Sequence, residues 1–288
     1  KKYVRFTSRG IKPGKFVKPY FTFGLYALLT SMYISFNVLF LGIVSTDIEV
    51  GYYSSATKLF SVILAFFTSF STVMMPRMSN MLANNDVKSA KNLIYKSFEF
   101  LYPLALILIL IGEFFAPQII MFLSGPGYEG AILPFRIILP LIFIIGTEQI
   151  LIVQILTPMR KDMAVLINSI VGSIFGLALN FAIVPRLGCT GSAIVWLCSE
   201  IAVFCSAFYF VLRASGNILP VKLLIKNIIL LFIPIIFIIL MQKTFLNEYV
   251  VMGVSVIFVM LYTGLTQIFI VRNSIACSIL SQISHREL

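Results

Sequence analysis

The 288-residue chain is strongly apolar, because 59% of its residues are hydrophobic and only 11% are charged. Soluble domains carry about 25% charged residues, so this composition excludes a water-soluble protein. The formal net charge of +11 does not indicate nucleic-acid binding, since that function needs a large solvated basic face, which so apolar a chain lacks.

Residues 1–20 are basic, and the chain opens with Lys1 rather than Met. They do not contain the apolar core of a signal peptide. We interpret them as a basic cytoplasmic segment, and we expect the start of the chain to be a cut or an internal boundary.

Apolar segments recur along the rest of the chain. A membrane-spanning helix needs about 20 mostly apolar residues. Eight segments satisfy this length: 21–43, 52–76, 98–123, 131–157, 163–185, 190–213, 224–242 and 249–271. They are too long for barrel strands and show no alternation, so their backbones can satisfy their hydrogen bonds in lipid only as helices. The predicted fold class is an all-α polytopic membrane protein with about eight transmembrane helices.

The basic residues predict the orientation of these spans. Lys and Arg gather in or beside alternate connections, which hold 18 of them, whereas the other connections hold only Arg186 and Lys243. Because Lys and Arg accumulate in cytoplasmic loops, both ends of the chain are predicted to be cytoplasmic.

Segment 77–97 is predicted to be the one long connection between spans. Its apolar residues from Leu82 to Ile94 recur at roughly helical spacing with lysines between them. Two interpretations stay open, a short helix in the membrane interface or a solvated connector that helps to fix topology.

The sequence contains no recognisable catalytic apparatus. The external connections are short, the lone His285 lies in the tail, and no Ser-His-Asp or Cys-His set or phosphate-binding glycine loop is present. The cysteines lack metal-type spacing and read as small buried apolar residues: Cys189, Cys198, Cys205 and Cys277. We therefore expect neither an enzyme nor a metal or cofactor site.

Five ionisable side chains fall within the predicted spans: Lys58, Glu113, Arg136, Glu148 and Glu200. Each costs about 2.5 to 3.5 kcal/mol on insertion scales, so they are expected to face protein or water rather than lipid. Lys58 and Arg136 lie roughly 8 to 10 Å inside the external ends of their helices at about 1.5 Å per residue.

Lys58 and Arg136 are candidate substrate-binding residues. Two cations in the outer half of a bundle can line a cavity that receives a phosphate or diphosphate headgroup. The alternative is structural: they pair with Glu113, Glu148 or Glu200, or Lys58 extends to the membrane interface.

Glu148 and Glu200 lie nearer the middle of their predicted spans. They are candidates for binding a coupling proton or cation. Alternatively, each could form an ion pair with Arg136 or Lys58, which would give it a structural role only.

Two stretches of the sequence resemble a known family. The run Asn37–Gly42, the segment from Glu49 through Lys58 and the later Val73–Arg77 resemble the seventh and eighth helices of bacterial polysaccharide flippases. These flippases belong to the multidrug/oligosaccharidyl-lipid/polysaccharide exporter superfamily. The segment from Asn180 to Ala193, continuing to Glu200, is similar to the turn before the family's twelfth helix.

The resemblance covers about residues 20–213, and the chain departs from it at one place. Many relatives carry an acidic residue near Asn37, which this chain lacks. An ion site near Asn37 is therefore not expected.

The resemblance implies a MATE-like fold with two six-helix lobes around a central cavity. Residues 21–213 would form the second lobe, and residues 214–288 would add two helices and a cytoplasmic tail. By position, Lys58 and Arg136 would then face the cavity. The first lobe is missing from this chain, so we expect either a carboxy-terminal portion or a half transporter that pairs with another chain.

The implied function is to flip undecaprenyl-diphosphate-linked oligosaccharide across the bacterial inner membrane for O-antigen, capsule or exopolysaccharide synthesis. The expected partners are this lipid-linked oligosaccharide and membrane lipids. A cation-coupled multidrug exporter of the same superfamily is the alternative, and it should use acidic and aromatic cavity residues rather than basic ones. A non-transporting membrane scaffold is a third possibility.

Overall fold

The computed structural model describes residues 14–243 and 247–277, and these residues form helices and no strands. Most of the predicted basic segment 1–20 and of the predicted tail lies outside them. The first six helical elements are α1 (Gly14–Val44), α2 (Asp47–Ala83), α3 (Val87–Ser124), η1 (Glu129–Ala131), α4 (Ile132–Ile138) and α5 (Leu141–Glu148). The others are η2 (Gln149–Leu156), α6 (Asp162–Ser215), α7 (Val221–Leu230), α8 (Phe232–Gln242), α9 (Glu248–Thr266) and η3 (Gln267–Val271).

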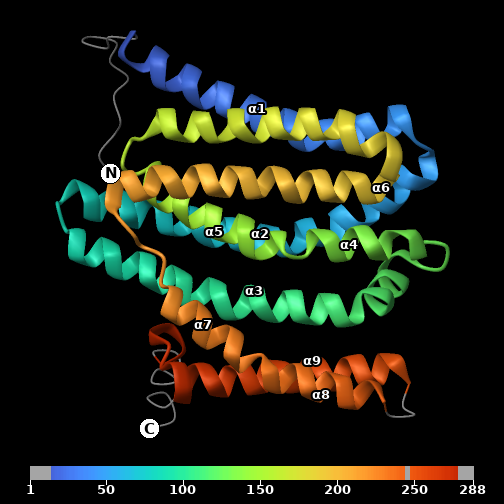
Figure 1. Cartoon of the computed structure of the whole chain (residues 1–288). Coiled ribbons are helices and arrows are strands. Elements are labelled where there is room, and N and C mark those ends of the chain that lie inside the picture. Colours follow the sequence, from blue (N-terminus) through green and yellow to red (C-terminus); the bar gives the residue numbers. More distant parts are fainter. Residues whose placement is uncertain (1–13, 244–246, 278–288) are drawn as a thin grey trace, which may run out of the picture.

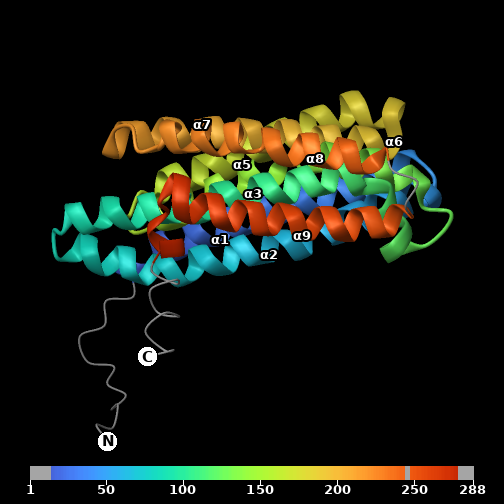
Figure 2. The same cartoon turned by 90° about the horizontal axis from the view of Figure 1, so that it is seen from below.

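The helices run side by side along one direction (Figure 1). α1 packs extensively along α6 at one side, α2, α4 and α5 lie in the middle next to α3, and α8 and α9 lie at the opposite side. Seen from below, α2 lies along one edge of the bundle (Figure 2). We call the end where α1 begins and η3 ends the near end, and the end that holds Gly188 the far end.

Gly188 divides α6 into two antiparallel helices. The 54-residue element has non-helical backbone angles at Gly188, φ +53° and ψ −132°, and the chain reverses direction there (Figure 1). Six helices are long and apolar enough to cross a membrane, and the bent pair from Glu129 to Leu156 is a seventh. Because α6 contributes two spans, the described residues contain eight, as predicted for the fold class.

The reversal at Gly188 is held by Glu49 at the start of α2. The backbone N–H of Cys189 donates to Glu49 Oε2 at 2.7 Å, which satisfies a group left free at the start of the second half of α6. A Cβ atom added to Gly188 would lie 2.5 Å from the same oxygen. Glycine is therefore required here both by its positive φ and by the space available.

Replacing Gly188 by alanine is expected to destabilise the fold. The new Cβ would displace Glu49 and strain the backbone, which costs about 1 to 3 kcal/mol of unfolding free energy. Thermal unfolding of the purified protein in detergent measures this as a lower midpoint. Gly253→Ala is the matched control, since an added Cβ meets nothing within 4 Å there, and an equal loss in both variants would contradict the explanation.

The span predicted at 131–157 is broken rather than straight. Segments Glu129–Ile138 and Leu141–Leu156 meet at an angle of 40°. Pro140 causes the break, because proline has no N–H to donate and its ring clashes with the preceding turn. The part of this span after the break, α5, continues as the π-helix η2, which starts directly after Glu148.

The prediction of a long connection at 77–97 was wrong. α2 continues to Ala83 and α3 begins at Val87, so only residues 84–86 connect them. Asp86 caps α3 by accepting the backbone N–H of Ser89 at 3.0 Å. Hydropathy marked only the apolar part of each helix, whereas the amphipathic ends extend beyond it.

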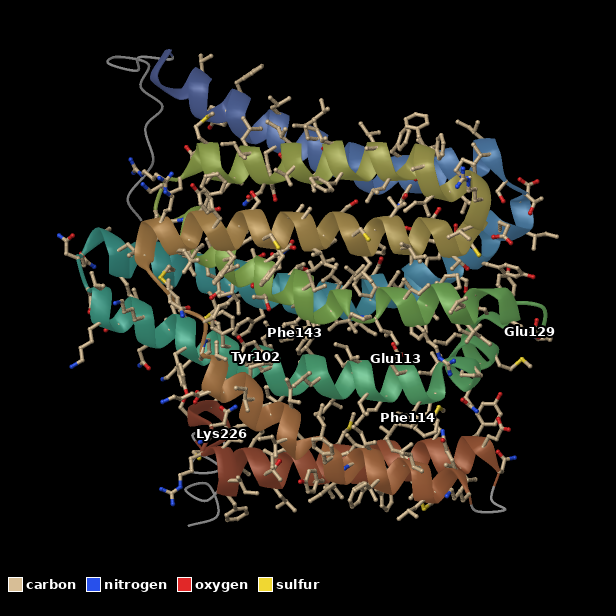
Figure 3. All side chains as sticks on the ribbon, in the orientation of Figure 1. Tyr102, Glu113, Phe114, Glu129, Phe143 and Lys226 are labelled. Atoms are coloured by element: carbon tan, nitrogen blue, oxygen red, sulfur yellow. The ribbon has the colours of Figure 1, made fainter. Side chains whose placement is uncertain are left out.

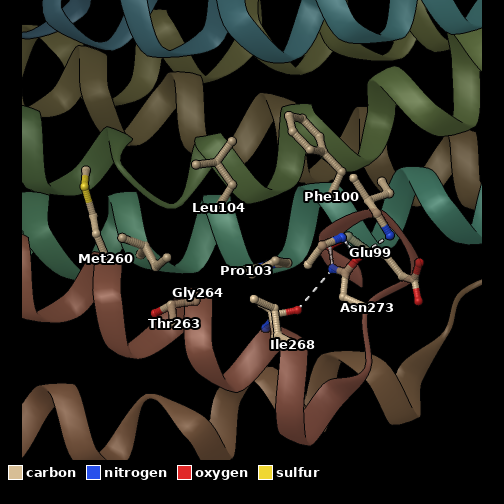
Figure 4. Close-up of a pocket in the computed structure, with 13 residues that line it drawn as sticks. Glu99, Phe100, Pro103, Leu104, Met260, Thr263, Gly264, Ile268 and Asn273 are labelled. Carbon is tan, nitrogen blue, oxygen red and sulfur yellow. Dashed lines mark hydrogen bonds between the residues drawn. The ribbon is translucent and has the colours of Figure 1, made fainter. Parts of the chain in front are cut away.

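The end of α9 is tied to α3 at a proline. Pro103 cannot donate to the carbonyl of Glu99 four residues earlier, and the Asn273 side chain supplies the missing hydrogen bond at 2.8 Å. Ser274 also donates to the Glu99 carboxylate through its hydroxyl and its backbone N–H. Figure 4 shows Glu99, Pro103 and Asn273 beside a mostly apolar groove of about 470 Å³ between α3 and α9.

Candidate functional site

The exposed face of α2 is a narrow polar stripe. Its residues recur every three or four positions, which places them on one side of the helix. They are Lys58, Ser61, Ala65, Ser69, Thr72 and Pro76. Exposed apolar residues border the stripe, whereas the stripe itself combines a charge with small and hydroxyl side chains, the types enriched where membrane helices pack against other helices.

The hydroxyl groups of the stripe bond to their own helix. Ser61 donates to the carbonyl of Thr57 at 2.7 Å, Ser69 donates to that of Ala65 at 2.7 Å, and Thr72 donates to that of Thr68 at 2.8 Å. Each hydroxyl proton is thus committed, whereas the oxygen lone pairs stay available. The stripe therefore offers hydrogen-bond acceptors.

Lys58 and Arg136 lie at the same depth in the bundle. α2 and α4 are packed neighbours that both start at the far end and run in the same direction. The ring of Tyr52 lies directly against Gly130, so these two residues share a level. Lys58 and Arg136 each follow six residues later, about 9 Å further along at 1.5 Å per residue.

The two cations differ in their surroundings. Lys58 is exposed on the stripe. The side chain of Arg136 is 41% exposed, and its Nε atom lies 4.0 Å from Oε2 of Glu113, whose side chain is 39% exposed. The labelled Glu113 lies on the length of α3 that faces α4 (Figure 3). Of the pairings that the sequence left open for Arg136, the described structure shows the one with Glu113, and it is loose.

Glu148 and Glu200 form a buried carboxyl pair. Glu148 lies at the end of α5 and Glu200 in the second half of α6, and they are 5% and 3% exposed. Their carboxyl groups are close enough to interact electrostatically. The two glutamates therefore share one buried site between α5 and α6.

Polar and aromatic residues surround this pair. Trp196 donates its indole N–H to Glu200 Oε1 at 3.0 Å, and the Trp196 ring packs edge-on against Phe60 at 5.1 Å. Tyr26 of α1 lies close enough to both carboxyl groups to interact with them electrostatically. Among the described residues, the Glu148 Oε1 atom is buried without a hydrogen-bond partner, so this part of the site has an unused acceptor.

Asn37 lies on the far-end side of the pair, in a second polar cluster. Its Nδ2 atom donates to the hydroxyl of Tyr53 and to the carbonyl of Ser192, each at 3.2 Å. Its Oδ1 atom is buried and has no hydrogen-bond partner within the part of the chain that the structure describes. Asn37 thus joins α1 to α2 and α6 through amide and hydroxyl groups rather than through a carboxylate.

Sequence reasoning missed several residues of these clusters. Trp196 and Tyr26 were not predicted as site residues, because aromatic residues are common in membrane helices. Gln154 is fully buried and links two helices, since it accepts from Ser97 at 2.7 Å and donates to Ser71 at 3.1 Å. A lone glutamine inside an apolar run was the available signal, because an amide in lipid needs partners.

A second cavity lies away from the cations. It encloses about 290 Å³ at the near end and is lined by the α2–α3 turn region, the end of η2 and the segment after α6, with Lys91 at its edge. This cavity and the groove beside α9 therefore do not include Lys58 or Arg136.

Comparison with known proteins identifies relatives of the chain. The MatE family matches residues 23–182, more than half of the sequence. Among solved structures, the chain is similar to one described as "Lipid II flippase MurJ, inward closed conformation", with a TM-score of 0.69 and 14% sequence identity. The match covers 92% of this chain but 56% of that one. No curated protein matches the chain.

Proposed function

The chain belongs to the MatE family and is a multi-pass membrane transporter rather than an enzyme, and from this premise we propose that it flips a lipid-linked oligosaccharide. The proposed substrate is an undecaprenyl-diphosphate-linked repeat unit for O-antigen, capsule or exopolysaccharide synthesis. The proposed location is the bacterial inner membrane.

The observation that carries this proposal is the shared depth of Lys58 and Arg136 on adjacent helices. Both side chains are accessible, and Arg136 has only a loose partner. Lysine and arginine are the side chains that bind phosphate, and arginine can do so with two parallel hydrogen bonds. A diphosphate placed between α2 and α4 would thus meet two cations.

The polar stripe supports a sugar-bearing substrate. Sugar hydroxyls can donate hydrogen bonds, and Ser61, Ser69 and Thr72 offer oxygen acceptors whose own protons are already committed. An apolar drug would gain little from such a surface. The diphosphate and the first sugars would therefore lie along α2.

The polar stripe also needs a cover other than lipid. The chain spans about half the length of the similar flippase structure. We propose that residues 21–213 form one transporter lobe and that a missing first lobe, or a partner chain, faces α2 across a water-filled cavity. Residues 214–288 would then be an added helix pair and tail, and the transporter would alternate access by rocking of the lobes.

The proposed orientation places the near end in the cytoplasm. Exposed basic residues of the described chain gather there, including Lys88, Lys91, Arg160 and Lys161. Cytoplasmic ends of membrane helices are enriched in lysine and arginine. Both termini would be cytoplasmic, and Lys58 and Arg136 would lie in the outer half of the membrane.

Glu148 and Glu200 are the proposed coupling site. A buried carboxyl pair can take up and release a proton as access alternates. This same buried acidic pair with its aromatic neighbours favours the alternative function, a cation-coupled multidrug exporter. The two functions differ in whether Lys58 and Arg136 are needed.

Deleting the gene that encodes the chain separates these functions. A flippase predicts loss of surface polysaccharide and accumulation of its lipid-linked precursor on the inner side of the membrane. An exporter predicts sensitivity to cationic drugs with the surface polymer intact. A scaffold predicts that no charge substitution inside the bundle alters any flux. Intact surface polysaccharide in the deletion strain would overturn the flippase proposal.

A further inference from the structure

Glu113 and Arg136 occupy equivalent positions in two neighbouring broken helices. Pro117 follows Glu113 by four residues in α3, and Pro140 follows Arg136 by four residues at the α4–α5 break. Next to Pro117, Phe115 leaves the helical region with φ −114° and ψ 20°. Because a proline leaves the carbonyl four residues earlier without its helical partner, each charged residue sits one turn before a bend.

The contact between Glu113 and Arg136 is an incomplete ion pair. The Nε–Oε2 distance of 4.0 Å exceeds that of a hydrogen bond, and the buried Nε atom has no hydrogen-bond partner in the described structure. The guanidinium thus lies in the electric field of the carboxylate but keeps its donors available. Such half-exposed pairs are weak.

We infer that Glu113 is a competitor that occupies Arg136 until an anionic headgroup displaces it, an inference that rests on the proposed function. A diphosphate carries more charge than a carboxylate and can take the free donors of Arg136 in two parallel hydrogen bonds. The diphosphate therefore displaces Glu113 and binds Arg136. Because every ligand of Arg136 must displace Glu113, the glutamate lowers the affinity of the site for all anions by a similar factor, and only a tightly binding headgroup occupies the site at low concentration.

Displacement of Glu113 also removes the link between the two bends. With Arg136 bound to the headgroup, the segment of α3 beyond Phe115 and the segment of α4 before Leu139 are no longer held together by charge.

The test is a binding series with Glu113→Gln. The full-length protein in lipid nanodiscs is titrated with farnesyl diphosphate, a short polyprenyl diphosphate, by calorimetry. We expect Glu113→Gln to bind the diphosphate about fivefold more tightly, an affinity change that corresponds to the loss of one weak ion pair. We expect Arg136→Ala to bind at least about tenfold more weakly. Damage to the fold would weaken binding, so a gain is diagnostic.

Two further variants complete the series. Glu129→Gln removes the same charge at the start of η1, where Glu129 accepts the backbone N–H of Gly127, and should leave affinity unchanged. Glu113→Gln in an Arg136→Ala background should give no gain. Farnesyl monophosphate should gain by a similar factor from Glu113→Gln, because displacement of Glu113 costs each ligand of Arg136 the same.

The outcomes separate this inference from the proposed function. No measurable diphosphate binding by the unmodified protein, or binding unaffected by Arg136→Ala, would overturn both. Binding that depends on Arg136 but does not tighten in Glu113→Gln would overturn the competitor role alone. A gain that persists without Arg136 would also overturn it, because it would come from general charge rather than competition.

Discussion

Transport by the Lys58→Ala/Arg136→Ala double variant is expected to fall at least about a hundredfold. Each cation would lose a charge-assisted contact with the diphosphate, worth about 1.5 to 3 kcal/mol, or roughly tenfold or more apiece. The measurement is translocation of a fluorescent lipid-linked oligosaccharide in proteoliposomes that contain the full-length protein. Recovery of surface polysaccharide in a deletion strain provides a second readout.

Lys243→Ala is the matched control for this experiment. Lys243 is an exposed lysine at the far end of α8, away from the polar stripe of α2. Its loss lowers the net charge without touching the proposed site. If the double variant transports as well as Lys243→Ala, Lys58 and Arg136 do not bind the headgroup.

Glu148→Gln and Glu200→Gln are each expected to abolish stimulation of transport by a proton gradient. An amide can keep a hydrogen bond to the remaining carboxyl, so the fold is retained, but it carries no proton to exchange. A gradient of one pH unit supplies about 1.4 kcal/mol per proton, so stimulation of up to about tenfold is at stake. The measurement compares proteoliposomes with and without an imposed gradient.

Glu248→Gln is the control for the carboxyl pair. Glu248 starts α9 and accepts a hydrogen bond from Gln118, which glutamine can also accept. Its variant should keep full stimulation. Equal stimulation in all three variants would show that Glu148 and Glu200 hold the fold together rather than carry a proton.

The fold was largely predictable, because a helix that spans the bilayer must be apolar and hydropathy measures this property. The eight apolar segments and the fold class are confirmed, and the break at Pro140 follows from a proline within a predicted span. Helix ends were less predictable. Beyond the hydrocarbon region helices are amphipathic, so α2 and α3 continue through the supposed connection 77–97.

The candidate site was predictable in its members but not in its pairings. Insertion cost singled out Lys58, Glu113, Arg136, Glu148 and Glu200 as residues that need protein or water. Which of them meet depends on how helices rotate and pack, and sequence spacing contains no information on that across separate helices. Thus the contact of Glu148 with Glu200, and the place of Trp196 beside them, needed three-dimensional packing.

The long α2–α3 hairpin has a mechanical consequence. With 37 and 38 residues, these helices are about 55 Å long, whereas the hydrocarbon layer is about 30 Å thick. In the proposed orientation, their tip at Asn84 and Asn85 therefore extends beyond the bilayer into the cytoplasm. If α2 tilts during the proposed transport cycle, this tip moves through a larger arc than the middle of the helix, so a probe attached there would report the motion from outside the bilayer.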